Sequence, residues 1–164
     1  MVPRGAVTES ACTISDLNDR PDFCATVADR IWLAWWKEKG TARHEIETRV
    51  RENLNPDGFP FAVIAHDGDD FHGTASVIAS DLDERPDYTP WIAAVWVDPQ
   101  HRGKGTGGAI VRHAARIALA RGFETIYLCA LPEKSDFYLN LGWSLLEEDV
   151  GEHKLCVLTV TATP

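Results

Sequence analysis

A short glycine-rich stretch between Val97 and Gly108 combines bare backbone with positive charge. It reads VDPQHRGKGTGG, and His101, Arg102 and Lys104 stand among its glycines. Glycine has no side chain, so a ligand can approach the backbone N–H groups closely. Free N–H groups at the start of a helix attract negative charge, and arginine and lysine add to that attraction. The stretch therefore predicts a binding site for an anion such as a pyrophosphate.

Two phosphate-binding patterns can be compared with this stretch. The P-loop pattern is absent, because no Gly-Lys pair is followed by Ser or Thr. Gly103, Gly105 and Gly108 do match G-x-G-x-x-G. A dinucleotide-binding fold, however, turns directly from a strand into the first glycine. Here Asp98 to Arg102 intervene, so a nucleotide-binding oxidoreductase is kept only as an alternative.

The charge of the chain is negative overall but positive around this stretch. The 25 acidic and 16 basic residues give a net charge of −9, which argues against non-specific binding of nucleic acid. Between Pro99 and Phe123 there are five lysines and arginines and no acidic residue. A solvent-exposed basic helix face would explain Arg116 and Arg121, but it would not explain the glycines.

Composition predicts a single soluble domain in the cytoplasm. The chain has 164 residues, of which 45% are hydrophobic and 25% charged. No stretch reaches the roughly 18 apolar residues of a membrane span, and the N-terminus lacks a signal-peptide pattern. The cysteines have no zinc-like spacing, so we expect reduced thiols and no metal site. These cysteines are Cys12, Cys24, Cys129 and Cys156.

The pattern of apolar residues predicts an α/β fold with a mixed sheet. Helices are predicted over residues 21–39, 42–54, 109–120 and 133–141, and strands over 59–66, 71–80, 89–97, 125–131, 143–150 and 154–162. A turn at 67–69 joins the first two strands into a hairpin. The domain is expected to span residues 11–164. Residues 1–10, with a VPRG that looks like a protease-site remnant, are expected to be disordered or vector-derived.

Two motifs in this order resemble the GNAT N-acetyltransferase superfamily. The strand IAAVWV, then Asp-Pro, then Gln100-x-x-Gly103-x-Gly105 is similar to the family's acetyl-CoA motif. DFYLNLGW resembles its second signature, a Phe-Tyr pair on a short helix before a glycine and an aromatic residue. The resemblance covers roughly Ala11 to Ala162, and SDLDERPDYTPWIAAVWVDPQHRGKG further resembles a bacterial subgroup of mostly unassigned substrate. It implies a mixed, mostly antiparallel central sheet of six to seven strands with flanking helices.

The resemblance also implies an activity, the transfer of an acetyl group from acetyl-CoA to a primary amine by direct attack in a ternary complex. The pantetheine arm would lie along the fourth strand, against the backbone of Val95, Trp96 and Val97, where an N–H would stabilise the developing oxyanion. The cofactor's pyrophosphate would lie on the glycine-rich stretch. The residues implied there are Arg102, Gly103, Lys104, Gly105, Thr106, Gly107 and Gly108.

Tyr138 matches the family tyrosine that donates a proton to the departing CoA sulfur. A phenol with a pKa of about 10 is protonated at neutral pH and is a workable acid for a thiolate. The usual positions for a general base hold no ionisable carboxylate or imidazole here, since Trp91, Ala93 and Cys129 occupy them. Leu131 also replaces an asparagine that is frequent in the family.

The general base must then come from elsewhere, because an alkylammonium is only about one part in a thousand neutral at pH 7. A group of acidic residues just before the fourth strand could act through water. These residues are Asp81, Asp83, Glu84 and Asp87. Each can equally be a polar loop residue, and Asp87 is our choice of base.

In the family, the first two helices and the loop before the fourth strand line the acceptor side. Here they contribute aromatic and acidic residues: Trp32, Trp35, Trp36, Asp29 and Glu45. Such walls suit a small-molecule or peptide amine, through charge attraction and cation–π contacts. Tryptophans at this spacing are also typical of a core. No nucleic acid or membrane partner is expected, and a homodimer stays open.

The absence of a general base on the fourth strand is consistent with a second functional class. A non-catalytic acetyl-CoA-binding or sensor domain would bind the thioester but would release no thiol with any amine. The oxidoreductase alternative would instead bind a nicotinamide dinucleotide and not CoA.

Overall fold

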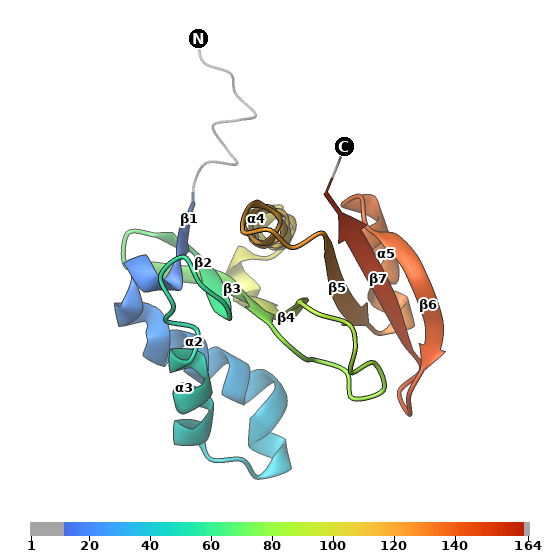
Figure 1. Cartoon of the computed structure of the whole chain (residues 1–164). Helices are drawn as coiled ribbons and strands as arrows, with labels where there is room; N and C mark the ends of the chain where they lie inside the picture. The colour runs from blue at the N-terminus through green and yellow to red at the C-terminus, as the bar shows by residue number, and fades with distance from the viewer. Residues whose placement is uncertain (1–11, 163–164) are drawn as a thin grey trace.

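The computed structural model describes residues 12–162, which form one seven-stranded sheet with helices on both faces (Figure 1). The strands lie in the order β1-β2-β3-β4-β5-β7-β6. Their bounds are β1 Thr13–Asp16, β2 Phe61–Asp67, β3 Asp70–Ile78, β4 Trp91–Val97, β5 Thr125–Ala130, β6 Ser144–Val150 and β7 Leu155–Thr161. Neighbouring strands are antiparallel except β4 and β5, which are parallel. The expected mixed, mostly antiparallel sheet is confirmed.

The edge strand β1 is an element that the sequence pattern does not predict. It is only four residues long, too short for an alternating pattern to stand out. It exists because it pairs with β2, with Thr13 opposite His66 and Asp16 opposite Val63. The expectation for residues 1–10 lies outside the residues that the structure describes.

The helices are α2 Cys24–Ile31, α3 Arg43–Arg51, α4 Thr106–Ala120 and α5 Ser135–Asn140. The predicted helix over 21–39 is not a single α-helix. After α2 the backbone widens into a π turn over Trp32–Trp36, which accommodates three indole rings, and then tightens into a 3-10 turn over Lys37–Lys39. Gly40 ends the segment with a φ of 82°, as predicted.

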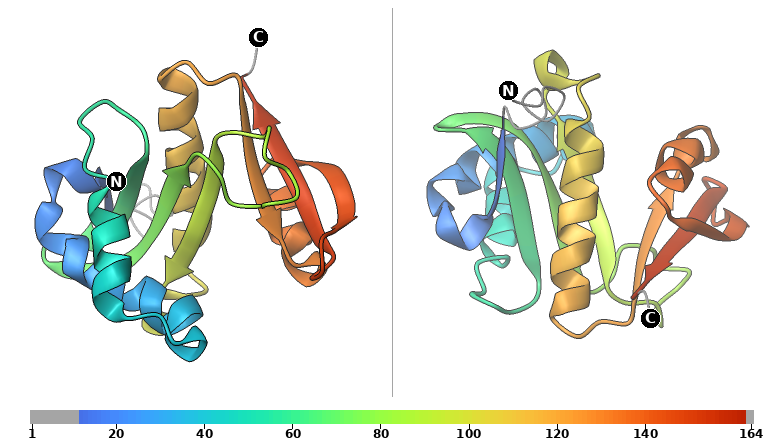
Figure 2. Two further views of the ribbon diagram at one scale, coloured as in Figure 1. Left: turned by 60° about the horizontal axis from the view of Figure 1, so that its bottom comes forward. Right: turned by 90° about the horizontal axis from the view of Figure 1, so that it is seen from above.

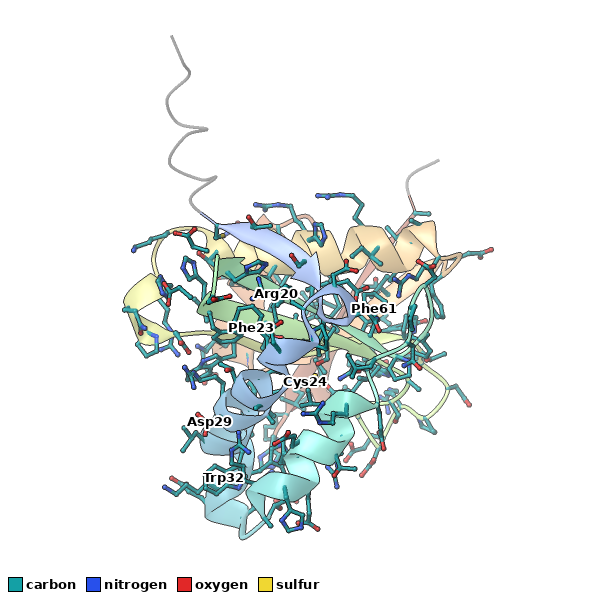
Figure 3. The ribbon with its side chains drawn as sticks, turned by 90° about the vertical axis from the view of Figure 1, so that its left-hand side faces the viewer. Arg20, Phe23, Cys24, Asp29, Trp32 and Phe61 are labelled. Carbon is teal, nitrogen blue, oxygen red and sulfur yellow. The ribbon has the colours of Figure 1, made fainter. Side chains whose placement is uncertain are left out.

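The two faces of the sheet carry different helices (Figures 1 and 3). Along β2, Phe61 and Val63 pack with α4 residues such as Ile110, whereas Ala62 and Ile64 pack with α2 and α3. This alternation follows from the two-residue period of a strand. The helix that follows the glycine-rich stretch is therefore held on one side of β4, and the tryptophan-rich segment on the other.

Strand β4 contains a β-bulge close to its middle. Thr74 of β3 lies opposite Trp96 and Ser76 lies opposite Ala93, so β4 has one residue more than its partner between these pairs. Ala94, within the bulge, has a φ of 54°, which is unusual for a residue with a side chain. A bulge leaves one backbone group without a partner in the ladder and bends the strand.

The sheet opens between β4 and β5. Among the described residues, these strands are paired only at Trp91 and Tyr127, and Figure 2 shows the sheet dividing into two parts here. Beyond Trp91, the side of β4 that faces β5 therefore lacks a neighbouring strand. Apart from the Val97 carbonyl, which accepts from Arg102 Nε at 2.7 Å, the backbone groups along this side can pair with another extended chain.

None of the helices within residues 12–162 is long and apolar enough to cross a bilayer.

The close approach of β3 to β4 beside the bulge gives a test of this architecture. A Cβ added at Gly73 would lie 2.6 Å from the Trp96 carbonyl oxygen and 2.9 Å from Ile110 Cδ1. Because the nearest atom is backbone, Gly73→Ala should lower the free energy of unfolding by about 2 kcal/mol, measured by urea denaturation. Gly107→Ala is the control, since its added Cβ would meet its nearest neighbour at 3.5 Å. Equal stabilities of the two variants would contradict the strand packing described here.

Candidate active site

A cleft of about 1310 Å³ follows the opening between β4 and β5. Its walls come from β4, the C-terminal half of β5, the end of β3 with the loop after it, helix α3, the start of α4, helix α5 and the tryptophan-rich segment. It is large enough for a drug-sized molecule. Segments far apart in the sequence therefore meet around one elongated space.

The glycine-rich stretch forms one end of the cleft. Gly103, Gly105, Gly107 and Gly108 all line it. Gly103 and Gly105 have φ values of 76° and 83°, and no heavy atom elsewhere in the described chain lies within 4 Å of the position that a Cβ would take at either. The backbone here adopts a conformation that favours glycine and is open to a ligand.

The start of α4 supplies unsatisfied donors next to these glycines. The helix begins at Thr106 after Gly105, and the Ala109 N–H donates to the Gly105 carbonyl at 3.1 Å. The N–H groups of Thr106, Gly107 and Gly108 precede the first intrahelical bond, so helix geometry provides them with no partner. Together with the positive end of the helix dipole, they can bind a phosphate.

Arg102 and Lys104, two basic residues of this stretch, differ in their position relative to the cleft. The Arg102 Nε donates to the Val97 carbonyl at 2.7 Å, and its guanidinium lies 4.6 Å from the centre of the Trp96 ring. This holds the Arg102 charge at the rim of the cleft. Lys104 is exposed and is not among the lining residues. Of the residues predicted to bind the cofactor, Lys104 alone does not line the cleft.

The side chains of β4, which forms one wall of the cleft, alternate between the two faces of the sheet. Val95 and Val97 pack towards the α4 side. Trp96 packs on the other side, where its Nε1 donates to Asp98 Oδ1 at 2.8 Å. The buried Asp98 carboxylate also accepts from Arg30 Nε at 2.9 Å. Side chains anchor the end of β4, while its backbone faces the opening.

A cluster of titratable side chains lies further along the cleft. It contains Asp81 from the loop after β3, Cys129 from β5 and Tyr138 from α5, all of which line the cavity. The Cys129 thiol donates to Asp81 Oδ2 at 3.5 Å. The sequence analysis named these residues separately, and the structure brings them together.

Burial shifts the pKa of each member of this cluster. Asp81 has surface open to the cleft, but protein surrounds the rest of its carboxyl group, and this desolvation raises its pKa to about 6. Burial, with Asp81 beside it, raises the pKa of the Cys129 thiol to about 12. Burial and Cys129 also raise the pKa of Tyr138 above its ordinary value. At neutral pH the cluster thus holds a carboxylate, a neutral thiol and a neutral phenol.

The loop that carries Asp81 is fixed to the far part of the sheet. Arg85 forms an ion pair with Glu147 of β6, and the Tyr88 hydroxyl donates to the same carboxylate at 2.6 Å. These contacts lower the pKa of Glu147 to about 2. Asp87, our choice of base from the sequence, is exposed and does not line the cleft.

Asp70, His72 and His101 form a separate polar cluster near the glycine-rich end, with potential ligand atoms within 4.8 Å of one another. The imidazole rings of His72 and His101 stack with centres 3.6 Å apart and planes at 17°. Both imidazoles approach the same carboxylate oxygen, since His72 Nε2 and His101 Nε2 lie 3.3 Å and 3.7 Å from Asp70 Oδ2.

Comparison with known proteins decides the family. The sequence profile of the Acetyltransferase (GNAT) family matches residues 26–143. The chain belongs to the GNAT family. Among curated proteins, none matches this chain.

Several solved structures share this GNAT fold over most of the chain. An aminoglycoside 6'-N-acetyltransferase complexed with coenzyme A has a TM-score of 0.68 and 21% identity, covering 93% of this chain and 98% of its own. The yncA protein from Salmonella typhimurium, with its cofactor acetyl-CoA, has a TM-score of 0.71 and 17% identity, covering 93% and 97%. A spermidine N-acetyltransferase from Vibrio cholerae, with CoA and spermine, has a TM-score of 0.65 and 17% identity, covering 93% and 96%.

The residues predicted to line the acceptor side of the cleft do not all line it. Trp35 and Trp36 line it, but Trp32 is bonded through its Nε1 to the Thr41 carbonyl. Asp29 is paired with Arg30 and Arg43, and it and Trp32 lie along α2 and its continuation in Figure 3. Glu45 caps the Ala42 N–H. Neither Asp29 nor Glu45 lines the cleft. Both carboxylates bind nearby groups of the protein instead.

The open glycine backbone leads to a prediction about cofactor binding. A methyl group at Gly107 would project towards Val97 and Phe137, inside the cleft. We expect Gly107→Ala to raise the dissociation constant for CoA about tenfold without lowering the melting temperature, measured by calorimetry and thermal denaturation. Lys104→Ala, outside the lining, should change the affinity much less. An unchanged CoA affinity in Gly107→Ala would place the cofactor elsewhere.

Proposed function

We propose that this GNAT protein transfers an acetyl group from acetyl-CoA to a primary amine within a ternary complex. The observation that carries the proposal is the opening between β4 and β5, with an anion-binding backbone at one end and the Asp81–Cys129–Tyr138 cluster further along. The reaction requires a bound thioester, a base for the amine and an acid for the departing thiolate. One side of the cleft supplies groups suited to each requirement.

The residues around the opening fit acetyl-CoA. The free N–H groups at the start of α4 and the Arg102 guanidinium would hold the pyrophosphate, and the unpaired side of β4 from Val95 to Val97 would hold the pantetheine amides. When bound, acetyl-CoA supplies a thioester that is activated for attack. The bulge at Ala94 leaves a backbone group of β4 unpaired, which would stabilise negative charge on the acetyl oxygen.

Asp81 replaces Asp87 as the proposed general base. It lines the cleft, and its raised pKa of about 6 leaves it mostly ionised at neutral pH while making it a stronger base than an ordinary aspartate. It would accept the ammonium proton directly or through a water molecule. Both carboxylates are exposed, but Asp87 is outside the lining of the cleft, so it has no comparable position.

Tyr138 is the proposed general acid. It lines the cleft on α5, across from β4, and its raised pKa keeps the phenol protonated throughout the neutral range. Cys129 does not compete with the amine as an acetyl acceptor, because a thiol with a pKa of about 12 is almost entirely protonated at neutral pH. The cluster thus separates the roles of base and acid between two side chains.

The pKa of Asp81 gives a pH prediction. A base must be ionised, so the contribution of Asp81 to kcat/KM should appear as pH rises through about 6 and should be lost below it. In Asp81→Asn we expect kcat/KM at neutral pH to fall roughly a hundredfold, and this inflection to disappear from the pH profile. Asp87→Asn is the matched control and should behave like wild type. The reverse result would restore Asp87 as the base.

Removing the Tyr138 hydroxyl tests the proposed acid. Tyr138→Phe should lower kcat about a hundredfold, because the thiolate would then leave without a proton donor. The dissociation constant for acetyl-CoA should change little, since the ring remains in place. Turnover would be followed by thiol release and affinity by calorimetry. A variant that keeps wild-type turnover at every pH removes Tyr138 from the mechanism.

The other functional classes are separated by two measurements. Thermal denaturation with acetyl-CoA, CoA and NAD distinguishes a thioester-binding protein from an oxidoreductase, which only NAD would stabilise. Thiol release with a panel of amines then distinguishes an enzyme from a sensor domain. Stabilisation by acetyl-CoA with no thiol release from any amine would favour the sensor.

A further inference from the structure

Two cations meet on one tryptophan in the wall of the cleft. Lys39 Nζ lies 4.9 Å from the centre of the Trp36 ring, and the Arg49 guanidinium carbon lies 5.2 Å from it. Lys39 ends the segment after α2, whereas Arg49 belongs to α3. All three residues line the cleft. An indole ring can hold a cation in place through its negative face.

Neither cation has an acidic partner within ion-pair distance among residues 12–162. On the same helix Arg43 and Arg51 both pair with Glu47, whereas Glu45, four residues before Arg49, accepts from the Ala42 N–H. Glu52 is the acid nearest in sequence that also lines this part of the cleft. Among the residues that line this part of the cleft, the two cations therefore outnumber the acid.

Positive charge at this place does not suit a polycationic acceptor. Like charges drawn together inside a cleft repel, and a cleft focuses this effect more than an open surface does. Lys39 and Arg49 are exposed side chains that line the cavity, and a guanidinium can bind a carboxylate with two parallel bonds. The chemistry of this wall is complementary to an anion.

We propose that the acceptor is an amine that also carries a carboxylate, such as an amino acid. This inference rests on the proposed acetyl transfer. The amine would lie at Asp81 and Tyr138, and the carboxylate would be bound by Lys39 and Arg49. Each charged group of a zwitterionic ligand would then face a group of opposite charge in the cleft. The aminoglycoside and spermidine enzymes that share the fold are only 17–21% identical, so their acceptors do not carry over.

Matched acceptors test the charge preference directly. γ-Aminobutyrate, butylamine and putrescine share one carbon chain and differ at the far end by a carboxylate, a methyl group or an ammonium. Leucine, leucinamide and isopentylamine make the same comparison with the carboxylate next to the amine. In at least one series we expect kcat/KM for the carboxylate to exceed that for its uncharged analogue about tenfold, as one charge-assisted hydrogen bond would produce. A preference for putrescine or the uncharged amines overturns the inference.

Variants then assign the preference to the two cations. Arg49→Met and Lys39→Met should each remove most of the carboxylate preference and leave kcat/KM for the uncharged amine unchanged. Arg51→Met on the same helix and Lys37→Met on the same turn are the controls. Lys37 also lies over a tryptophan, at 5.5 Å from the ring centre of Trp32, but neither control residue lines the cleft. Equal losses for all acceptors, or a loss of CoA affinity, would contradict a role in acceptor selection.

A binding measurement keeps this inference separate from the proposed activity. Calorimetry of leucine and γ-aminobutyrate with the CoA-bound protein should show saturable binding that weakens about tenfold in Arg49→Met. If no amine releases thiol, acetyl transfer fails, yet this measurement still decides whether the cations bind a carboxylate. If putrescine and butylamine are acetylated best and neither carboxylate binds, the transfer stands and this inference fails.

Discussion

The structure depends on the interruption of one sheet between two parallel strands. β4 and β5 pair at Trp91 and Tyr127 and then diverge, so a strand in the middle of the order has a free backbone side like that of an edge strand. Unpaired N–H and C=O groups are costly when they are buried. Here these groups face an open cleft, so they are not buried by protein. The bulge at Ala94 adds to this local irregularity. Both features leave hydrogen-bonding backbone of β4 without a neighbouring strand.

The elements around the opening keep it from closing. Helix α4 packs against β2, β3 and β4 through Ile110 and its neighbours, and β5 is held instead by its antiparallel pairing with β7. The loop after β3 crosses between the two parts, and the Arg85–Glu147 pair fixes it to β6. This frame places Asp81 and the start of α4 along the same cleft. Preorganised groups of this sort lower the cost of binding and of charge development.

The charges of the molecule are arranged more locally than its net charge of −9 suggests. Several carboxylates are engaged in structural pairs, as Asp29, Glu47 and Asp98 are with arginines. Three of the cations that line the cleft are Arg102, Lys39 and Arg49. A ligand therefore experiences the field of a few side chains rather than that of the whole acidic surface.

Local sequence determined the parts of this protein that depend on local geometry. Glycines before a helix predict an open helix start, alternating apolar residues predict strands, and Gly40 ends a helix because it tolerates a positive φ. The order of these elements, with Tyr138 on a short helix, indicates the family. Only the tertiary structure decided features that join distant segments. β1 exists because it pairs with β2. The pKa of Asp81 is raised because segments outside its own loop surround its carboxyl group. Likewise, Lys39 and Arg49 share Trp36 because two helical segments pack together. Desolvation and charge pairing depend on distance in space, and the spacing of residues along the chain does not contain that distance.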